Sequence, residues 1–226
     1  MSGPLVEIKG LHFGHPGQAP LFSGLDLRFP AGTAIAVMGP NGRGKTTLLR
    51  LLAGLEPPAA GRIRIAGVDP ARAGPQEMAR LVGMVAQSSD RHFLCARVID
   101  EVAFGPRTLG LADPVALARA ALERLGIAEL SAAHPLDLNA GQRRLAALAV
   151  AVAHRPRLLL LDEAQRGLDR INRDRLEQLI ATEVAGGTTV LAVTHDTDFA
   201  HRIASEMLIL PGSGRPFVSG RVGILR

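Results

Sequence analysis

The sequence predicts an α/β fold built around a mainly parallel β-sheet. The first indication is a short apolar strand at 33–38, which leads through a glycine-rich loop into a helix at 46–53. The second is the apolar run Leu158–Leu161, which is typical of a strand covered on both faces. The third is an amphipathic helix at 171–184 followed by an apolar strand at 188–193, so helices and strands alternate along the chain.

The other elements complete this expectation. Alternating apolar and polar residues at 5–9, 25–29 and 61–67 predict a small antiparallel layer beside the main sheet. A buried strand is expected at 81–86, ending in Gln87. From 88 to about 137 the pattern predicts a helix at 114–125 and no clear strand. We therefore expect one domain, residues 1–226, with a helical subdomain inserted at roughly 88–153.

Composition narrows the class of protein. The chain has 226 residues, a formal charge of +5, 24 arginines and two lysines. The arginines are spread along the sequence and form no dense basic run. The chain also lacks Trp and Tyr, so few side chains could stack on nucleic-acid bases. Nucleic acid is therefore not expected as a partner. A single cysteine, Cys95, excludes an internal disulfide framework. No secretion signal is expected, and the longest apolar run, at 145–153, falls short of the roughly 20 residues that cross a bilayer.

The glycine-rich loop has the phosphate-loop pattern of glycine, four residues, then Gly-Lys-Thr. Its glycines let backbone N–H groups surround phosphates, and the following helix adds its positive end. One of the two lysines stands here, where a compact ammonium has to fit between phosphate oxygens. We expect Lys45 to reach the β- and γ-phosphates and Thr46 to ligate Mg²⁺. The expected nucleotide-binding residues are Gly39, Pro40, Asn41, Gly42, Arg43, Gly44, Lys45, Thr46 and Thr47.

Two carboxylates follow the apolar run at 158–161. In a phosphate-loop enzyme the first, Asp162, holds Mg²⁺, and the second, Glu163, orients and deprotonates the attacking water. Beside a phosphate loop, this pair predicts hydrolysis of a nucleoside triphosphate.

With these motifs, the chain resembles the nucleotide-binding subunits of ATP-binding-cassette transporters almost from end to end, which implies a RecA-like P-loop NTPase core. The resemblance implies that Gln87 contacts Mg²⁺ and the attacking water and relays contact to a membrane partner. It implies that His195 contacts the γ-phosphate. Asp169, in Gly-Leu-Asp, matches the loop that passes between two such subunits.

The family's signature, usually Leu-Ser-Gly-Gly-Gln, is Leu138-Asn139-Ala140-Gly141-Gln142 in this chain. Asn139 is a favoured helix N-cap, so the helix start is expected to survive. The resemblance implies that Asn139, Ala140, Gly141 and Gln142 approach the γ-phosphate bound by a second chain, so that two chains enclose two ATP molecules.

The chain departs from the family at several positions. Arg43 stands where serine is common, and Ala164-Gln165-Arg166 replaces a proline, a threonine and a small residue. Because the chain has no tyrosine, another side chain must stack on adenine. His15 is the first candidate and Phe13 the second.

The segment 98–111, Val-Ile-Asp-Glu-Val-Ala-Phe-Gly-Pro-Arg-Thr-Leu-Gly-Leu, is similar to one in the ATPases of energy-coupling-factor importers of vitamins and transition metals. The alternative is an ordinary helix entry, with Phe104 in the core and Gly105-Pro106 as a turn.

The resemblance therefore implies an ATPase subunit at the cytoplasmic face of the cell membrane. Its partners would be integral-membrane subunits and a second, identical or related, ATPase chain. Two other functions remain open: a soluble cassette ATPase acting on nucleic acid or in cofactor assembly, and a weakly hydrolysing regulatory subunit, which Arg43, Asn139 and Ala140 suggest.

Overall fold

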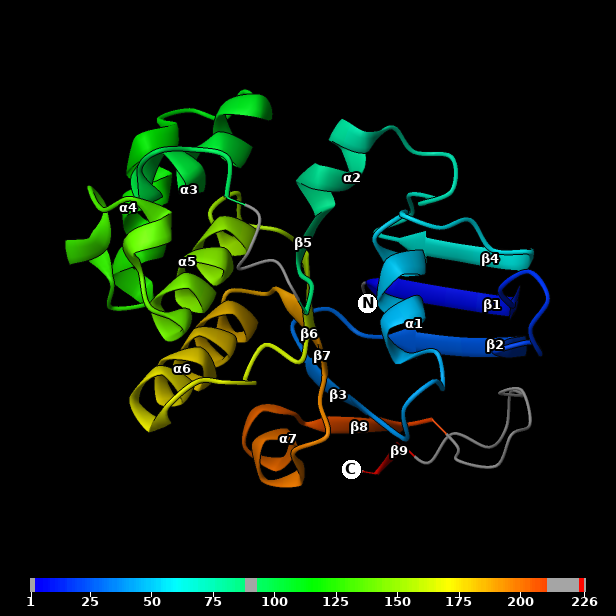
Figure 1. The fold of residues 1–226 in the computed structure, drawn as a ribbon. Helices are drawn as coiled ribbons and strands as arrows, with labels where there is room; N and C mark the ends of the chain where they lie inside the picture. Colours follow the sequence, from blue (N-terminus) through cyan, green and yellow to red (C-terminus); the bar gives the residue numbers. More distant parts are fainter. Residues whose placement is uncertain (1–2, 88–92, 211–223, 226) are drawn as a thin grey trace.

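Two β-sheets and a group of helices make up the fold (Figure 1). The computed structural model describes residues 3–87, 93–210 and 224–225. The parallel sheet runs through the middle, with the antiparallel sheet on one side and most helices on the other (Figure 1). None of the described helices is long and apolar enough to cross a membrane.

The central sheet has the strand order β5-β6-β7-β3-β8-β9. Its first five strands are parallel, and only β9 is antiparallel to its neighbour. The strands are β5 (Val82–Val85), β6 (Leu158–Asp162), β7 (Thr189–Val193), β3 (Ala34–Met38), β8 (Glu206–Ile209) and β9 (Ile224–Leu225). Since parallel strands end at the same edge, the loops that follow β3, β5, β6 and β7 converge there.

Alternate residues of the central strands enter two different cores. In β6, Leu159 and Leu161 face one apolar cluster, whereas Leu158 and Leu160 face the other. The same alternation occurs in β3 and β7. Both faces of these strands are therefore buried, which explains their unbroken apolar sequences.

The antiparallel sheet has the order β2-β1-β4, with β1 at Val6–Phe13, β2 at Phe22–Phe29 and β4 at Ala60–Ile65. Helix α1 (Lys45–Leu52) contributes its leucines to the apolar cluster that this sheet shares with the central sheet. The helix that follows the phosphate loop is thus held by packing on both sides.

The other core lies beneath the helices α3 (Val98–Thr108), α4 (Pro114–Arg124), α5 (Ala140–Val152) and α6 (Arg170–Ala185). The 3₁₀ turns at Ala128–Leu130 and Pro135–Asp137 connect α4 to α5. Two short helices, α2 (Pro75–Leu81) and α7 (Thr197–Ile203), precede β5 and β8 respectively.

The predicted α/β class is confirmed, but one strand boundary and the alternative interpretation of segment 98–111 were wrong. Leu81 ends α2 and does not begin a strand. Gly105-Pro106 is not a turn, because α3 continues through it, with Val102 and Pro106 buried. Phe104 is 49% exposed and not part of the core. Helices α2, α3 and α7 and strand β8 were not predicted from the sequence.

Candidate functional site

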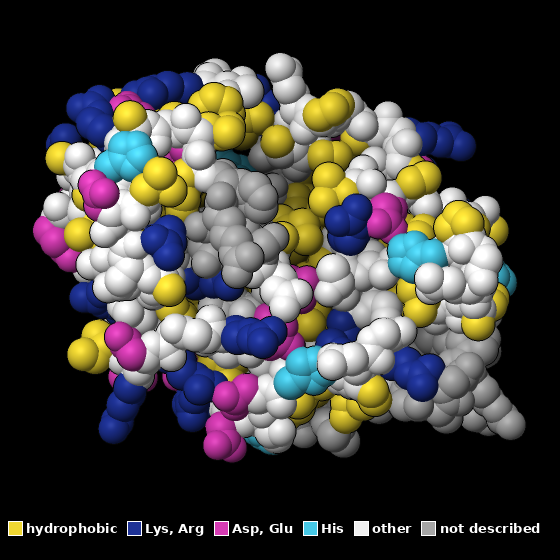
Figure 2. All heavy atoms as spheres, in the orientation of Figure 1, with side chains coloured by type: hydrophobic (Ala, Val, Ile, Leu, Met, Phe, Trp, Pro, Cys, Tyr) yellow, Lys and Arg dark blue, Asp and Glu magenta, His cyan; other side chains and the backbone are white. Residues whose placement is uncertain are grey.

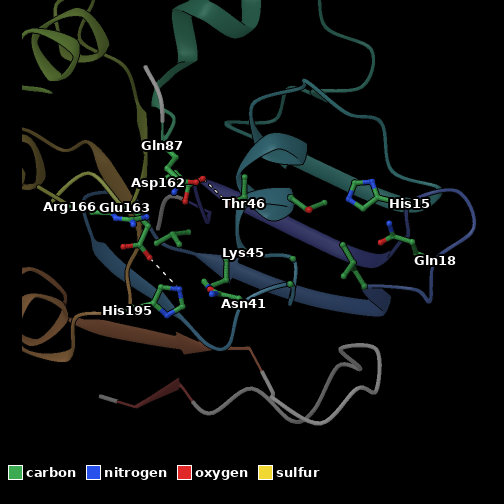
Figure 3. A pocket seen from close by; sticks show the side chains of 15 residues that line it. His15, Gln18, Asn41, Lys45, Thr46, Gln87, Asp162, Glu163, Arg166 and His195 are labelled. Carbon is green, nitrogen blue, oxygen red and sulfur yellow. Dashed lines mark hydrogen bonds and ion pairs between the residues drawn. The ribbon is translucent and has the colours of Figure 1, made fainter. Parts of the chain in front are cut away.

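A cavity of about 670 Å³ opens at the carboxyl edge of the parallel sheet. This volume suits a small-molecule ligand. It receives side chains from the loops after β3, β5, β6 and β7, and from the turn after β1 (Figure 3). It is lined by His15, Gln18, Leu21, Asn41, Gly42, Gly44, Lys45, Thr46, Thr47, Gln87, Asp162, Glu163, Arg166, Val193 and His195.

The phosphate loop can form because its three glycines adopt positive φ values that other residues resist, and two of them also lie too close to neighbours for a Cβ atom. Gly39 has φ of 139°, and a Cβ atom there would lie 2.6 Å from the Leu210 carbonyl oxygen. Gly44 has φ of 85°, and a Cβ atom would lie 2.9 Å from Cζ of Phe22. Gly44 is also the N-cap of α1, which no side chain caps. The first-turn N–H groups of α1 therefore remain available to an anion.

Lys45 is held within this loop. Its Nζ donates to the carbonyl oxygens of Gly39 and Pro40, at 2.7 and 2.9 Å. Burial lowers the pKa of the Lys45 ammonium, while the negative charges of Glu163 and Asp162 act in the opposite direction. An ammonium has three hydrogens, so these two bonds leave one for a further acceptor.

Thr46 and Asp162 meet although 116 residues separate them: the Thr46 hydroxyl donates to Oδ2 of Asp162 at 2.8 Å. Gln87 lines the same part of the cavity (Figure 3). Hydroxyl, carboxylate and amide oxygens suit Mg²⁺, which is usually bound by one or two carboxylates together with water and phosphate oxygens. Within the described residues no group of three or more His, Cys, Asp or Glu could hold a metal ion. The oxygen set thus fits Mg²⁺ bound together with a nucleotide.

Glu163 and His195 lie next to each other at one end of the cavity (Figure 3). Oε1 of Glu163 lies 3.5 Å from Nε2 of His195. Glu163 has a left-handed φ of 52°, and its N–H donates to the carbonyl of Val193 at 3.0 Å. The backbone of Glu163 is therefore fixed next to the end of β7, which limits the positions that its carboxylate can take.

Asp196 anchors the segment that carries His195. It caps α7 by accepting the Phe199 N–H at 2.8 Å, and it pairs with Arg173 of α6. The Phe199 amide and the Arg173 guanidinium lower the pKa of this carboxyl group. Arg173 also lies over the Phe199 ring, 5.3 Å from its centroid. These contacts of Arg173 with Asp196 and Phe199 connect the start of α6 with the segment that follows β7.

His15 lies at the end of the cavity away from Glu163 and His195 (Figure 3). Its ring packs edge-on against Phe13, with centroids 5.2 Å apart. Phe13, the second candidate for stacking on adenine, does not line the cavity. Gln18 and Arg166 do line it, although the sequence did not identify them as site residues. Arg166 could have been noticed as a cation three residues after Glu163.

The signature residues form a helix start, as expected. The Asn139 side chain accepts from the Gln142 N–H at 2.9 Å, and the Gln142 side chain accepts from the Asn139 N–H at 3.0 Å, a complete capping box. Asp169 caps α6 in a similar way. Among the expected binding residues, Gly39, Pro40, Arg43, Asn139, Ala140, Gly141, Gln142 and Asp169 do not line the cavity of their own chain.

Basic, acidic and histidine side chains line the cavity. Figure 2 shows basic, acidic and histidine side chains side by side in the middle of the face.

Comparisons with known proteins identify the family of this chain. The family model described as "ABC transporter" matches residues 22–166. A cobalt import ATP-binding protein, CbiO, of Rhodobacter capsulatus is 36% identical over 96% of this chain and 79% of its own length. A nickel import ATP-binding protein, NikO, of the same organism is 37% identical over 92% of this chain and 85% of its own.

A solved structure, cbiO1 from Clostridium perfringens, superposes with a TM-score of 0.82 at 26% identity, covering 92% of this chain and 85% of that one. Its title describes it as part of the ABC transporter complex cbiONQ. The chain belongs to the ABC transporter family of ATP-binding proteins. It has the P-loop NTPase fold of that family and is an ATP-binding chain with ATPase activity.

Proposed function

We propose that this chain is the ATPase subunit of an energy-coupling-factor importer for a vitamin or a transition-metal ion. The observation that carries the proposal is the convergence of Lys45, the Thr46–Asp162 pair and the Glu163–His195 pair in one cavity. The import function named for the cobalt and nickel relatives supports the choice of solute class.

The residues of the cavity have different roles in ATP hydrolysis. Lys45 and the N–H groups of the phosphate loop bind the triphosphate, and His15 stacks on the adenine at the other end. Thr46, Asp162 and Gln87 would hold Mg²⁺, which would neutralise charge on the phosphate oxygens. Glu163 takes a proton from water as the water oxygen attacks the γ-phosphorus and the bond to the β-phosphate oxygen breaks. His195 contacts the γ-phosphate.

The site is completed by a second chain. Asn139, Ala140, Gly141, Gln142 and Asp169 lie outside the cavity of their own chain, which is the placement expected if they approach the nucleotide of a partner. The α5 N-terminus, with its capping box, would supply N–H groups to the partner's γ-phosphate. ATP binding then closes two chains together, and hydrolysis releases them.

The membrane subunits dock beside Gln87 and the helical subdomain, which we place at roughly 88–153 within a single domain, 1–226. Four large apolar side chains in the described part of this region are exposed: Leu94 at 78%, Leu136 at 76%, Phe104 at 49% and Val115 at 38%. Exposed apolar groups of this size favour an interface. The chain would accordingly lie at the cytoplasmic face of the cell membrane.

Mg²⁺-dependent ATP hydrolysis by purified wild type and Glu163→Gln tests the site assignment. We expect the variant to bind ATP normally, to turn over at least about a hundredfold more slowly, and to accumulate as an ATP-dependent dimer in light scattering. Near-normal turnover by Glu163→Gln would contradict the role of Glu163, and wild type that does not hydrolyse ATP would favour the regulatory alternative.

Import itself is tested by purifying the tagged chain from membranes together with its bound partners. Cells expressing the identified complex should accumulate one of the labelled solutes, cobalt, nickel or biotin, and cells carrying Glu163→Gln should not. Co-purification with DNA or RNA in place of membrane subunits would reject the importer proposal.

A further inference from the structure

Gln165 occupies an unusual position between the carboxylate of Glu163 and the end of β7. Its side chain is buried, with 8% exposure. Its Nε2 donates to Oε2 of Glu163 at 2.9 Å and to Oγ1 of Thr194 at 2.7 Å. Both hydrogens of the amide are thus used, one on the loop after β6 and one on the loop after β7.

The orientation of this amide follows from its partners. An ionised carboxylate can only accept hydrogen bonds, so the amide atom that faces Glu163 has to be the nitrogen. Thr194 is fully buried, and its hydroxyl oxygen also accepts the Asp196 N–H at 3.0 Å. A continuous chain of hydrogen bonds therefore runs from Glu163 through Gln165 and Thr194 to the residue after His195.

The two carboxylate oxygens of Glu163 differ in their hydrogen bonding. Oε2 accepts from Gln165, whereas Oε1 is buried, has no hydrogen-bond partner among the described residues and lies 3.5 Å from Nε2 of His195. Oε1 is thus the carboxylate oxygen that no hydrogen bond from the described residues holds. The left-handed φ of Glu163 is unfavourable for a residue with a side chain, so its carboxylate needs support from its surroundings.

Packing alone does not account for a glutamine here. Its Oε1 is buried without a hydrogen-bond partner among the residues described, which is destabilising. An apolar side chain of similar size would avoid that loss. The two donated bonds are what the amide contributes to this position.

We propose that Gln165 is a positioning residue that fixes the orientation of the Glu163 carboxylate for hydrolysis and links this carboxylate to the His195 segment. The proposal rests on the proposed ATPase site. Gln165 acts through Glu163 and does not itself touch the nucleotide, because it does not line the cavity.

The test is steady-state hydrolysis by Gln165→Met, which keeps the side-chain length and removes both donors. We expect turnover to fall about 10- to 100-fold, as for a misplaced catalytic group, while the KM for ATP changes less than about threefold. Gln178→Met, on the exposed surface of α6, is the matched control and should behave like the wild type.

A double-mutant cycle shows whether Gln165 acts through Glu163. In the Glu163→Gln background, single-turnover hydrolysis should be unchanged by adding Gln165→Met. An equal loss in both backgrounds, or normal turnover of Gln165→Met beside an inactive Glu163→Gln, would overturn this proposal and leave the proposed function standing. Normal turnover of Glu163→Gln would instead reject the proposed site.

Thr194→Val provides a second measurement if Gln165→Met does not fold, as judged by thermal unfolding. It keeps the shape of the side chain but removes the acceptor at the far end of the amide. We expect a smaller loss of turnover, again dependent on Glu163. A loss that persists in the Glu163→Gln background would again contradict the proposal.

Discussion

Replacing Lys45 by methionine removes the ammonium from the phosphate loop and keeps a side chain of similar length. In the structure Nζ is held by the Gly39 and Pro40 carbonyls, at 2.7 and 2.9 Å, which leaves one hydrogen for phosphate. A hydrogen bond to a charged group contributes about 1.5–3 kcal/mol. Losing one such bond should raise the Kd for Mg·ATP about 10- to 150-fold.

The same substitution should not destabilise the protein at neutral pH. Burial lowers the pKa of Lys45 from its ordinary value of 10.5, and the side chain is only 7% exposed. Because the folded-state pKa is the lower one, the unfolded chain binds more protons between the two values. The free energy of unfolding then rises with pH through that window. Lys45→Met lacks this contribution, so any stability advantage of the variant should shrink as the pH approaches 10.5.

Calorimetric titration with a non-hydrolysable ATP analogue measures the first effect, and urea unfolding between pH 7 and about 10.5 measures the second. Lys45→Arg is the second variant: it keeps the charge but brings a wider, planar group, and it should also bind more weakly. Wild-type affinity in Lys45→Met would refute the assignment of Lys45 to the phosphates. A variant much less stable than the wild type at pH 7 would refute the account of its burial.

Two further predictions concern the frame around the site. Arg124→Met should lower the free energy of unfolding by about 3 kcal/mol, because the Glu183 carboxylate, 5% exposed, loses its ion pair. Adding Glu183→Gln should recover most of this in urea unfolding, and no recovery would show that packing of the arginine stem, not charge, was lost. Gly44→Ala should cost about 2 kcal/mol from its left-handed backbone and from the clash with Phe22. Gly42→Ala carries a similar φ without a close neighbour, so thermal unfolding should show a smaller loss, and equal losses would exclude the clash as a cause.

Local sequence patterns predicted the strands that are buried on both faces. The apolar runs that became β3, β6 and β7 are covered on both faces, so their sequences carry no polar interruption. The helices missed from the sequence, α2, α3 and α7, are short or contain residues that disfavour helices alone. Gly105-Pro106 resembles a turn in isolation, but the burial of Val102, Ala103 and Pro106 on one side of α3 keeps the helix intact.

Some residues of the candidate site could likewise be identified from the sequence, and others could not. Lys45, Thr46, Asp162 and Glu163 could be identified from the sequence, because their chemistry depends on short spacings around a glycine loop and a strand end. Gln18 carried no such pattern, and Arg166 was marked only by its spacing of three residues after Glu163. They line the cavity only because separate loops fold against it.

The sequence by itself determined the type of chemistry: a loop that binds phosphate, an oxygen set suited to Mg²⁺ and a carboxylate that can act as a base. Only the tertiary structure decided which atoms meet. The Thr46–Asp162 hydrogen bond, the Glu163–His195 contact and the Gln165 bridge each join residues from different strands or loops. The parallel sheet brings those loops to one edge, and their contacts depend on strand order and packing, which no local pattern of residues encodes.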